Sequence, residues 1–155
     1  MTPKTAARAK VDVVLIDAAW SKALPGVERL VRKAARGALG TKVRSLTVAL
    51  SDDKRVQALN KRDRRKDKPT NVLSYPSGDR AFLGDVVLAR QTVWREARAQ
   101  GKPAEAHVSH LVVHGTLHLL GYDHETGEAD AERMEALERR ILKGLGIADP
   151  YQGGK

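Results

Sequence analysis

The sequence predicts an α/β domain, because short runs typical of β-strands alternate with longer stretches that have the spacing of amphipathic helices. Two strand-like runs, residues 11–17 and 43–50, are rich in valine and leucine. Between them, residues 26–39 place apolar side chains at helical spacing, with arginine and lysine on the other faces. The length of 155 residues is enough for one substantial core, and no internal repeat is visible.

The middle of the chain continues this alternation. Residues 51–53 (Ser-Asp-Asp) offer an N-cap for a helix that runs through Leu59. Residues 70–76 and 81–89 have strand-like composition and flank a turn of Pro, Ser and Gly, so we expect them to pair. Asp85 follows a glycine in the second of these strands. It either serves a metal site or has a structural role, and ordinary turn chemistry favours the structural role.

Helical patterns dominate the second half of the chain. A helix over residues 90–100 ends at a glycine, and another begins near Pro103, a residue favoured in the first turn. The last helix covers residues 130–143, with an apolar stripe facing the core. We expect a single domain over residues 1–155, frayed at 1–10 and 149–155.

Three histidines near one helix end are the strongest functional signal. His114 and His118 are four residues apart, which places both imidazoles on one helical face. Gly121 ends the helix and lets the chain turn, so that His124 can approach the same point. Three imidazoles with a fourth position left to water are typical of catalytic zinc.

The neighbouring residues leave alternatives open. His107 and His110 lie in the same helical stripe, and we expect His110 to have a packing role or to support a ligand. The histidine spacing also equals that of the metzincin proteases, HExxHxxGxxH. Gly115 stands where those enzymes have the glutamate that accepts a proton from water, which weakens a protease interpretation.

Composition narrows the class of protein. The chain has 28 Lys and Arg against 19 Asp and Glu, a net charge of +9, which favours a polyanionic partner such as nucleic acid. Aromatic residues make up only 4%, too few for a platform that stacks single-stranded bases. There is no cysteine, so a metal ion would be held by imidazole or carboxylate. With no signal peptide or membrane span visible, we expect a cytoplasmic protein without membrane or disulfide-linked partners.

A basic segment precedes the third predicted strand. Its members are Lys61, Arg62, Arg64, Arg65, Lys66 and Lys68. Such a run is commonly a solvated surface, and that interpretation stays open. Because the run leads directly into residues 70–76, we expect a loop anchored at the sheet, from which an arginine can bind a phosphate bidentately.

Three segments resemble one known family. Residues 114–124, HGTLHLLGYDH, resemble the signature of the YbeY family, bacterial metal-dependent endoribonucleases that act in ribosomal RNA maturation and ribosome quality control. A second segment matches at residues 59–60, Arg64 and residues 68–76, and a third at residues 83–85. Asp63 and Tyr75 depart from the pattern, which often has an aromatic residue at the first position and usually phenylalanine at the second.

This resemblance implies both a fold and a function. The fold is a small mixed β-sheet packed with several helices, with one zinc ion held by His114, His118 and His124. The function is a single-strand-specific, zinc-dependent endoribonuclease that matures the 3′ end of 16S rRNA and takes part in ribosome quality control. Its partners are then rRNA and the ribosomal subunit. Arg64 and His114 are the expected catalytic residues, and the expected RNA-binding residues are Arg62, Arg64, Arg65, Lys66 and Lys68.

Two other classes of function remain open on the residues alone. A non-catalytic ribosome-assembly factor would bind RNA with the basic segment and use the metal only for its fold. A zinc peptidase would share the histidines. Three imidazoles also suit nickel, copper or iron. Asp123 is the carboxylate nearest to the histidines, and it either orients a ligand imidazole or acts as a general base.

Overall fold

The structure is a computed structural model and describes residues 9–68, 70–123 and 126–151. In chain order, the described elements are β1 (Val11–Leu15), α1 (Ala19–Ala23), α2 (Val27–Leu39), β2 (Ser45–Ser51), α3 (Asp53–Arg64), β3 (Val72–Pro76), β4 (Phe82–Ala89), α4 (Arg90–Ala99), α5 (Ala104–Leu119) and α6 (Glu128–Gly144).

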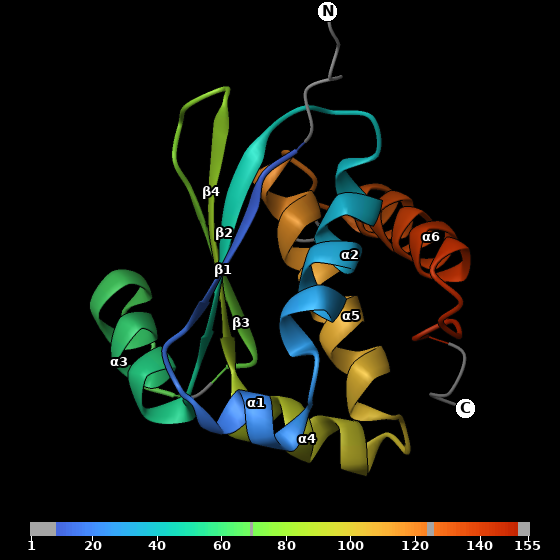
Figure 1. Cartoon of the computed structure of the whole chain (residues 1–155). Helices are drawn as coiled ribbons and strands as arrows, with labels where there is room; N and C mark the ends of the chain where they lie inside the picture. Colours follow the sequence, from blue (N-terminus) through green and yellow to red (C-terminus); the bar gives the residue numbers. More distant parts are fainter. Residues whose placement is uncertain (1–8, 69, 124–125, 152–155) are drawn as a thin grey trace, which may run out of the picture.

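The strands form one mixed sheet in the order β1-β2-β4-β3 (Figure 1). β1 and β2 are parallel, as are β2 and β4, whereas β3 and β4 form the antiparallel pair predicted from their short connection. Parallel neighbours require a crossover, and α2 supplies the one between β1 and β2. The predicted small mixed sheet with several helices is confirmed.

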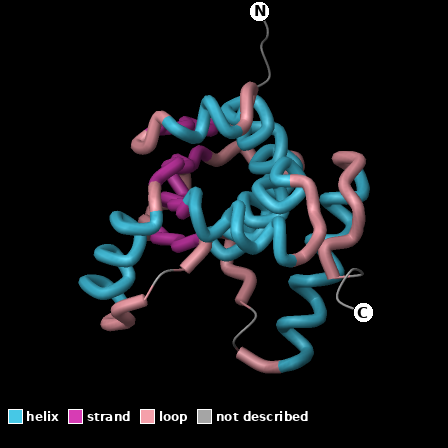
Figure 2. Tube along the Cα trace, turned by 90° about the horizontal axis from the view of Figure 1, so that it is seen from below, coloured by secondary structure: helices cyan, strands magenta, loops and turns pink. Residues whose placement is uncertain are grey.

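Helices cover the two faces of the sheet unequally. α2 and α5 pack on one face, α6 contacts both of them, and α3 lies on the other face (Figures 1 and 2). Successive residues of β4 alternate between the faces. Val86 and Leu88 belong to the large core under α2 and α5, and Val87 and Ala89 to a smaller cluster with residues of α3. The large core holds α5, the helix that carries the histidines, against the sheet.

The basic segment differs from the expected loop. α3 continues to Arg64, so Lys61, Arg62 and Arg64 lie in its last turn. Cations are favourable there, because the last carbonyl groups of a helix lack intrahelical partners. Arg65 ends the helix in the left-handed conformation, with φ of 58°. The segment is therefore a helix end followed by a short loop.

The fraying expected at residues 1–10 and 149–155 stays a prediction, and the described residues at both ends make polar contacts. The backbone N–H of Tyr151 donates to Oδ1 of Asp149 at 2.8 Å, and Nε of Arg139 reaches the same carboxylate at 3.3 Å. Near the other end, the carbonyl of Lys10 accepts a hydrogen bond from the N–H of Leu46 at 3.1 Å. Polar contacts with α6 and β2 therefore hold both segments. Residues 1–8 and 152–155 lie outside the described part.

Two further details differ from the expectation. Asp85 lies within β4, opposite Tyr75 of β3, so the role expected for it in a turn is wrong. Helix α1 has only five residues and no side-chain cap, and local periodicity does not reveal it. Its Trp20 is fully buried and donates its indole N–H to the carbonyl of Ser51 at 2.7 Å. Among the helices described, none is long and apolar enough to cross a membrane.

Candidate active site

Helix α5 brings two of the predicted metal ligands together. The ring centroids of His114 and His118 lie 4.9 Å apart, with the ring planes at 77°. Both side chains line a cavity of about 670 Å³. The apolar side of α5 is buried in the core, which fixes the histidine face toward the cavity.

The other walls of the cavity come from the end of α3, the loop after it, β3 and α4. Arg64, Lys66 and Lys68 supply positive charge, and Asp123 lies on the wall with the two histidines. Two histidine side chains and three cationic side chains therefore line one open space. This combination suits an anionic ligand that approaches a metal ion.

Gly115 sets how closely α5 approaches the sheet. A Cβ at this position would lie 2.7 Å from Cγ1 of Val86 and 3.3 Å from Oγ of Ser74. The Ser74 hydroxyl also donates to the carbonyl of Gly115 at 3.3 Å. A glutamate at position 115, as in the metzincins, has no room in this structure.

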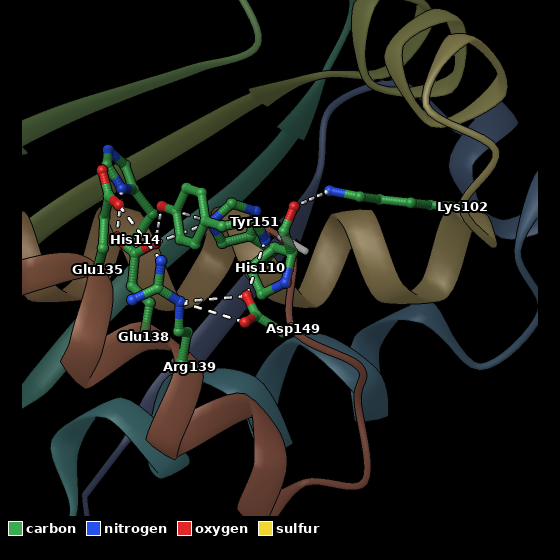
Figure 3. A network of polar contacts seen from close by, with 9 residues as sticks. Lys102, His110, His114, Glu135, Glu138, Arg139, Asp149 and Tyr151 are labelled. Atoms are coloured by element: carbon green, nitrogen blue, oxygen red, sulfur yellow. Dashed lines mark hydrogen bonds and ion pairs between the residues drawn. The ribbon is translucent and has the colours of Figure 1, made fainter. Parts of the chain in front are cut away.

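A buried carboxylate from α6 holds His114. Oε2 of Glu138 lies 2.7 Å from Nδ1 of His114, and Oε1 lies 2.8 Å from Nε2 of His110 (Figure 3). The Glu138 side chain is fully buried. Burial alone would raise the pKa of Glu138, but the hydrogen bonds from His110, His114 and Tyr151 lower it to about 2. Glu138 is therefore ionised at neutral pH.

Tyr151 completes this network from the end of the described chain. Its hydroxyl donates to Oε1 of Glu138 and lies 3.3 Å from Nε2 of His110. Burial, together with the neighbouring Glu138, raises the pKa of Tyr151, so the phenol stays protonated. The guanidinium of Arg139 lies 5.1 Å from the centroid of the Tyr151 ring.

Arg64 is held at the rim of the cavity by β3. Its NH2 group donates to the carbonyl of Ser74 at 2.9 Å, and its guanidinium lies 6.0 Å from the centroid of the Tyr75 ring. The Tyr75 hydroxyl donates to Oδ2 of Asp63 at 2.9 Å. The two residues that depart from the family pattern, Asp63 and Tyr75, thus contact each other and join the end of α3 to β3.

Asn60 anchors the basic loop. It is only 3% exposed, and its Nδ2 donates to the carbonyl of Lys68 at 3.1 Å. The carbonyl of Asn60 accepts a hydrogen bond from the N–H of Lys66 at 3.2 Å. These bonds hold the backbone of both lysines that line the cavity.

The predicted RNA-binding residues fall into two groups in the structure. Those that line the cavity are Arg64, Lys66 and Lys68. Arg62 and Arg65 are not among the described residues of its wall. Arg62 donates to Asp63 at 2.7 Å, and this hydrogen bond holds the pKa of Asp63 below its usual range. Arg62 instead lines a separate, mostly apolar depression with Ile16 and Val87.

Sequence comparison assigns the chain to a family. A family model described as Endoribonuclease YbeY matches residues 8–146. The chain belongs to the YbeY family. The protein named Endoribonuclease YbeY from Azorhizobium caulinodans is 49% identical over 154 residues, covering 92% of this chain and 96% of its own length. The protein of that name from a Chelativorans species is 52% identical over 132 residues, covering 81% and 80%.

A solved structure agrees with the YbeY fold of this chain. The solution structure of a Thermotoga maritima protein covers 92% of this chain and 99% of its own, with a TM-score of 0.56 and 23% sequence identity. At this identity the likeness supports the arrangement of helices and strands alone.

Of the three segments that resemble the YbeY family, the first two line the cavity, and residues 83–85 are not among its described lining residues. The end of α3 and β3 form one wall and α5 forms the other, while Gly84 of β4 lies against the carbonyl of Tyr75. His124, the third predicted ligand, lies outside the described residues, so the three-histidine site stays a prediction. Within the described residues, no group of three or more His, Asp or Glu side chains is placed to hold a metal ion.

Sequence reasoning missed Glu138 and Tyr151. The available signal was position: Met134, Glu138 and Leu142 are four residues apart, and all three are fully buried. A glutamate in the middle of an apolar stripe indicates a buried polar partner. His110 was expected to have a packing or supporting role, and it shares the Glu138 carboxylate with His114. His107 contacts Oε1 of Glu96 at 2.8 Å.

Proposed function

We propose that the chain is a zinc-dependent endoribonuclease that cuts single-stranded RNA, matures the 3′ end of 16S rRNA and takes part in ribosome quality control. The supporting observation is the single cavity shared by His114, His118 and Arg64. Membership of the YbeY family supports the same class of reaction. RNA suits a cavity with cationic walls in a chain of net charge +9.

The described residues fit a metal ion of the zinc type. Two imidazoles one turn apart line the cavity, and Nδ1 of His114 is held by Glu138, as is usual for a metal-ligating histidine. We assign one zinc ion per chain to His114, His118 and His124. When bound, zinc would supply a Lewis acid and an activated water molecule. We assign Asp123 to the orientation of a ligand imidazole.

Arg64 would stabilise the negative charge that develops on the phosphate during cleavage. A guanidinium has five N–H donors, and one NH2 group of Arg64 is oriented by the carbonyl of Ser74. The remaining donors can face a phosphate in the cavity. Lys66 and Lys68 add attraction for the RNA backbone, so they contribute to binding more than to the chemical step.

The first test is elemental analysis of the purified protein, paired with cleavage of single-stranded and structured ribosomal RNA before and after chelation. We expect about one zinc per chain, with cleavage that is lost on chelation and restored by zinc. His114→Ala should lose both zinc and cleavage while it keeps the fold. Cleavage by metal-depleted His114→Ala protein would rule out the proposed mechanism.

Arg64→Ala separates catalysis from binding. We expect turnover to fall by roughly 10²–10³-fold, the usual effect of removing one donor to a developing oxyanion. Arg29→Ala is the control, because it removes the same charge from an exposed position of α2 that does not line the described wall of the cavity. Zinc-loaded protein that binds RNA without cleaving it would instead indicate a non-catalytic assembly factor. A peptidase is disfavoured, since Gly115 leaves no room for the glutamate of that mechanism.

A further inference from the structure

We infer that Glu138 is a positioning residue that fixes the tautomer of His114, so that Nδ1 carries the proton and Nε2 faces the cavity. This inference rests on the proposed metal site and deepens it. It assigns a role in metal binding to a carboxylate on α6, 20 residues beyond His118 in the sequence. No sequence motif in the chain marks this residue.

The first support is the set of contacts that Glu138 makes. Oε2 lies 2.7 Å from Nδ1 of His114, Oε1 lies 2.8 Å from Nε2 of His110, and Oε1 also accepts a hydrogen bond from the hydroxyl of Tyr151 (Figure 3). In the described part of the chain these partners are two imidazoles and a phenol, with no lysine or arginine in the ion pairs of Glu138. Each carboxylate oxygen lies within hydrogen-bond distance of a ring nitrogen, at 2.7 and 2.8 Å. A carboxylate oxygen accepts in such a contact, so we assign the proton to each ring nitrogen that faces it.

The second support is the chemistry of a neutral imidazole, which has one N–H and one nitrogen with a lone pair. If Nδ1 of His114 donates to Glu138, the lone pair belongs to Nε2. A metal ion binds the lone pair and cannot bind a protonated nitrogen. Glu138 therefore selects the form of His114 that can act as a ligand through Nε2, the ring nitrogen that does not face Glu138, on a side chain that lines the cavity with His118.

The third support is the cost of the arrangement. Glu138 is fully buried between Met134 and Leu142 on the apolar stripe of α6. If its purpose were only to join α6 to α5, apolar residues in place of Glu138 and its partners together would serve as well, because replacing a whole buried polar group is often neutral or stabilising. A buried carboxylate beside a metal-ligating imidazole is instead explained by its effect on that imidazole.

The test uses Glu138→Gln in the full chain. An amide has the shape of the carboxylate but donates through one end, so it cannot accept from both histidines. We expect zinc affinity to fall by roughly 10–100-fold in competition with a chelator of known affinity. Glu132→Gln is the matched control, because it removes the same charge from an exposed position of the same helix. Unchanged zinc affinity in Glu138→Gln would overturn the inference and leave the proposed nuclease intact.

A second measurement observes the His114 tautomer directly in the wild-type protein, so it does not depend on the folding of a variant. Long-range ¹H–¹⁵N correlation spectra of the zinc-free wild-type chain, at about pH 8, distinguish protonated from unprotonated ring nitrogens. We expect His114 to have Nδ1–H and an unprotonated Nε2. The opposite tautomer would overturn the inference. Tyr151→Phe removes one donor to Glu138 and should leave the His114 tautomer unchanged.

The two proposals can fail separately. Zinc binding that depends on Glu138, in a protein that cleaves no RNA, would refute the nuclease and retain the positioning role. Cleavage that persists with unaltered zinc affinity in Glu138→Gln would refute only the positioning role. Thermal unfolding of the zinc-free variants shows whether a change in affinity reflects a loss of fold.

Discussion

At the scale of single residues, the absence of a side chain at position 115 is as important as the histidine beside it. The missing Cβ lets the backbone of α5 rest on Val86 and Ser74 of the sheet. Val86 is fully buried and branched at Cβ, so it cannot turn aside easily. The adjacent His114 is thereby placed over the edge of β3, within the same cavity as Arg64.

Gly115→Ala should therefore destabilise the protein, even though alanine is the better helix former. Overpacking against Val86 costs about 1–3 kcal/mol, and helix propensity returns up to about 1 kcal/mol. We expect the free energy of unfolding in urea to fall by about 1–2 kcal/mol. Gly144→Ala is the control, because a Cβ on Gly144 of α6 would have no atom within 4 Å, and it should stabilise the protein. Equal effects at both sites would contradict the contact.

The histidines and Glu138 show what residue patterns do and do not reveal. The i, i+4 spacing of His114 and His118 is local, so the sequence predicted that their rings would share one face. The partner of His114 comes from another helix, 24 residues away in the sequence. Packing between α5 and α6 creates that contact, and no local pattern specifies it.

At the scale of elements, β1, α2, β2 and the β3–β4 pair follow from local periodicity and turn residues. The N-cap predicted near Asp52 is confirmed, because its carboxylate accepts from the N–H of Arg55 at 2.8 Å. The prediction failed at the end of α3, where charge was interpreted as a loop although it favours a helix C-terminus. It also missed α1, which is stabilised by the burial of Trp20 rather than by propensity.

An ion pair joins the turn after β1 to the start of α4 and gives stability a dependence on pH. Nε of Arg90 donates to Oδ2 of Asp17 at 2.7 Å, and this hydrogen bond lowers the pKa of Asp17. A lowered pKa contributes stability above the unfolded value of about 3.9, and this contribution is lost as the pH falls through the folded pKa.

Asp17→Asn should therefore lower the free energy of unfolding by about 1.5–3 kcal/mol at pH 7, the usual range for a hydrogen bond to a charged group. The difference from wild type should shrink as the pH falls below about 4. Urea unfolding across this range measures it. Asp12→Asn, at an exposed position of β1, should change stability by less than about 0.5 kcal/mol at each pH. A difference that grows toward acid would contradict the assignment.

At the scale of the whole molecule, the positions of the basic residues show which of them can contribute to the site. Three of the cations line the cavity that holds the histidines, whereas others are spread over α2 and α6. The net charge follows directly from the composition, and from it we predicted a polyanionic partner. The sequence could not predict which cations face the site, because that depends on where α3 ends and how Asn60 holds the loop.

Binding of single-stranded RNA should weaken with salt, and Lys68 should contribute to this dependence. Removing one phosphate contact lowers the slope of log affinity against log salt by about 0.7 for a single strand. We expect that change for Lys68→Ala, measured by fluorescence anisotropy at several salt concentrations. Arg29→Ala, at an exposed position of α2, should leave the slope unchanged. Equal slopes for the two variants would show that the cavity is not where the phosphates bind.

The order of the strands is the part of the fold that the sequence left open. β3 and β4 are consecutive and pair directly, but β4 also lies beside β2, which precedes β3 by a helix and a loop. Each strand shows its own type and its buried residues. The strand that pairs with it from a distant part of the sequence, as β2 pairs with β4, depends on how α2 and α5 cover the sheet. This packing is a property of the assembled core.

Gly84 occupies a position where the structure accepts no other amino acid. Its φ is 139°, and a Cβ there would lie 2.0 Å from the carbonyl oxygen of Tyr75, so no other amino acid fits without moving the strand. A few residues away, Asp79 and Arg80 are exposed in the turn between β3 and β4. Exposed Arg80 can therefore be replaced at little structural cost, whereas the strand position at Gly84 accepts only glycine. Within one hairpin, we therefore expect amino-acid substitutions to accumulate quickly at position 80 and very slowly at position 84.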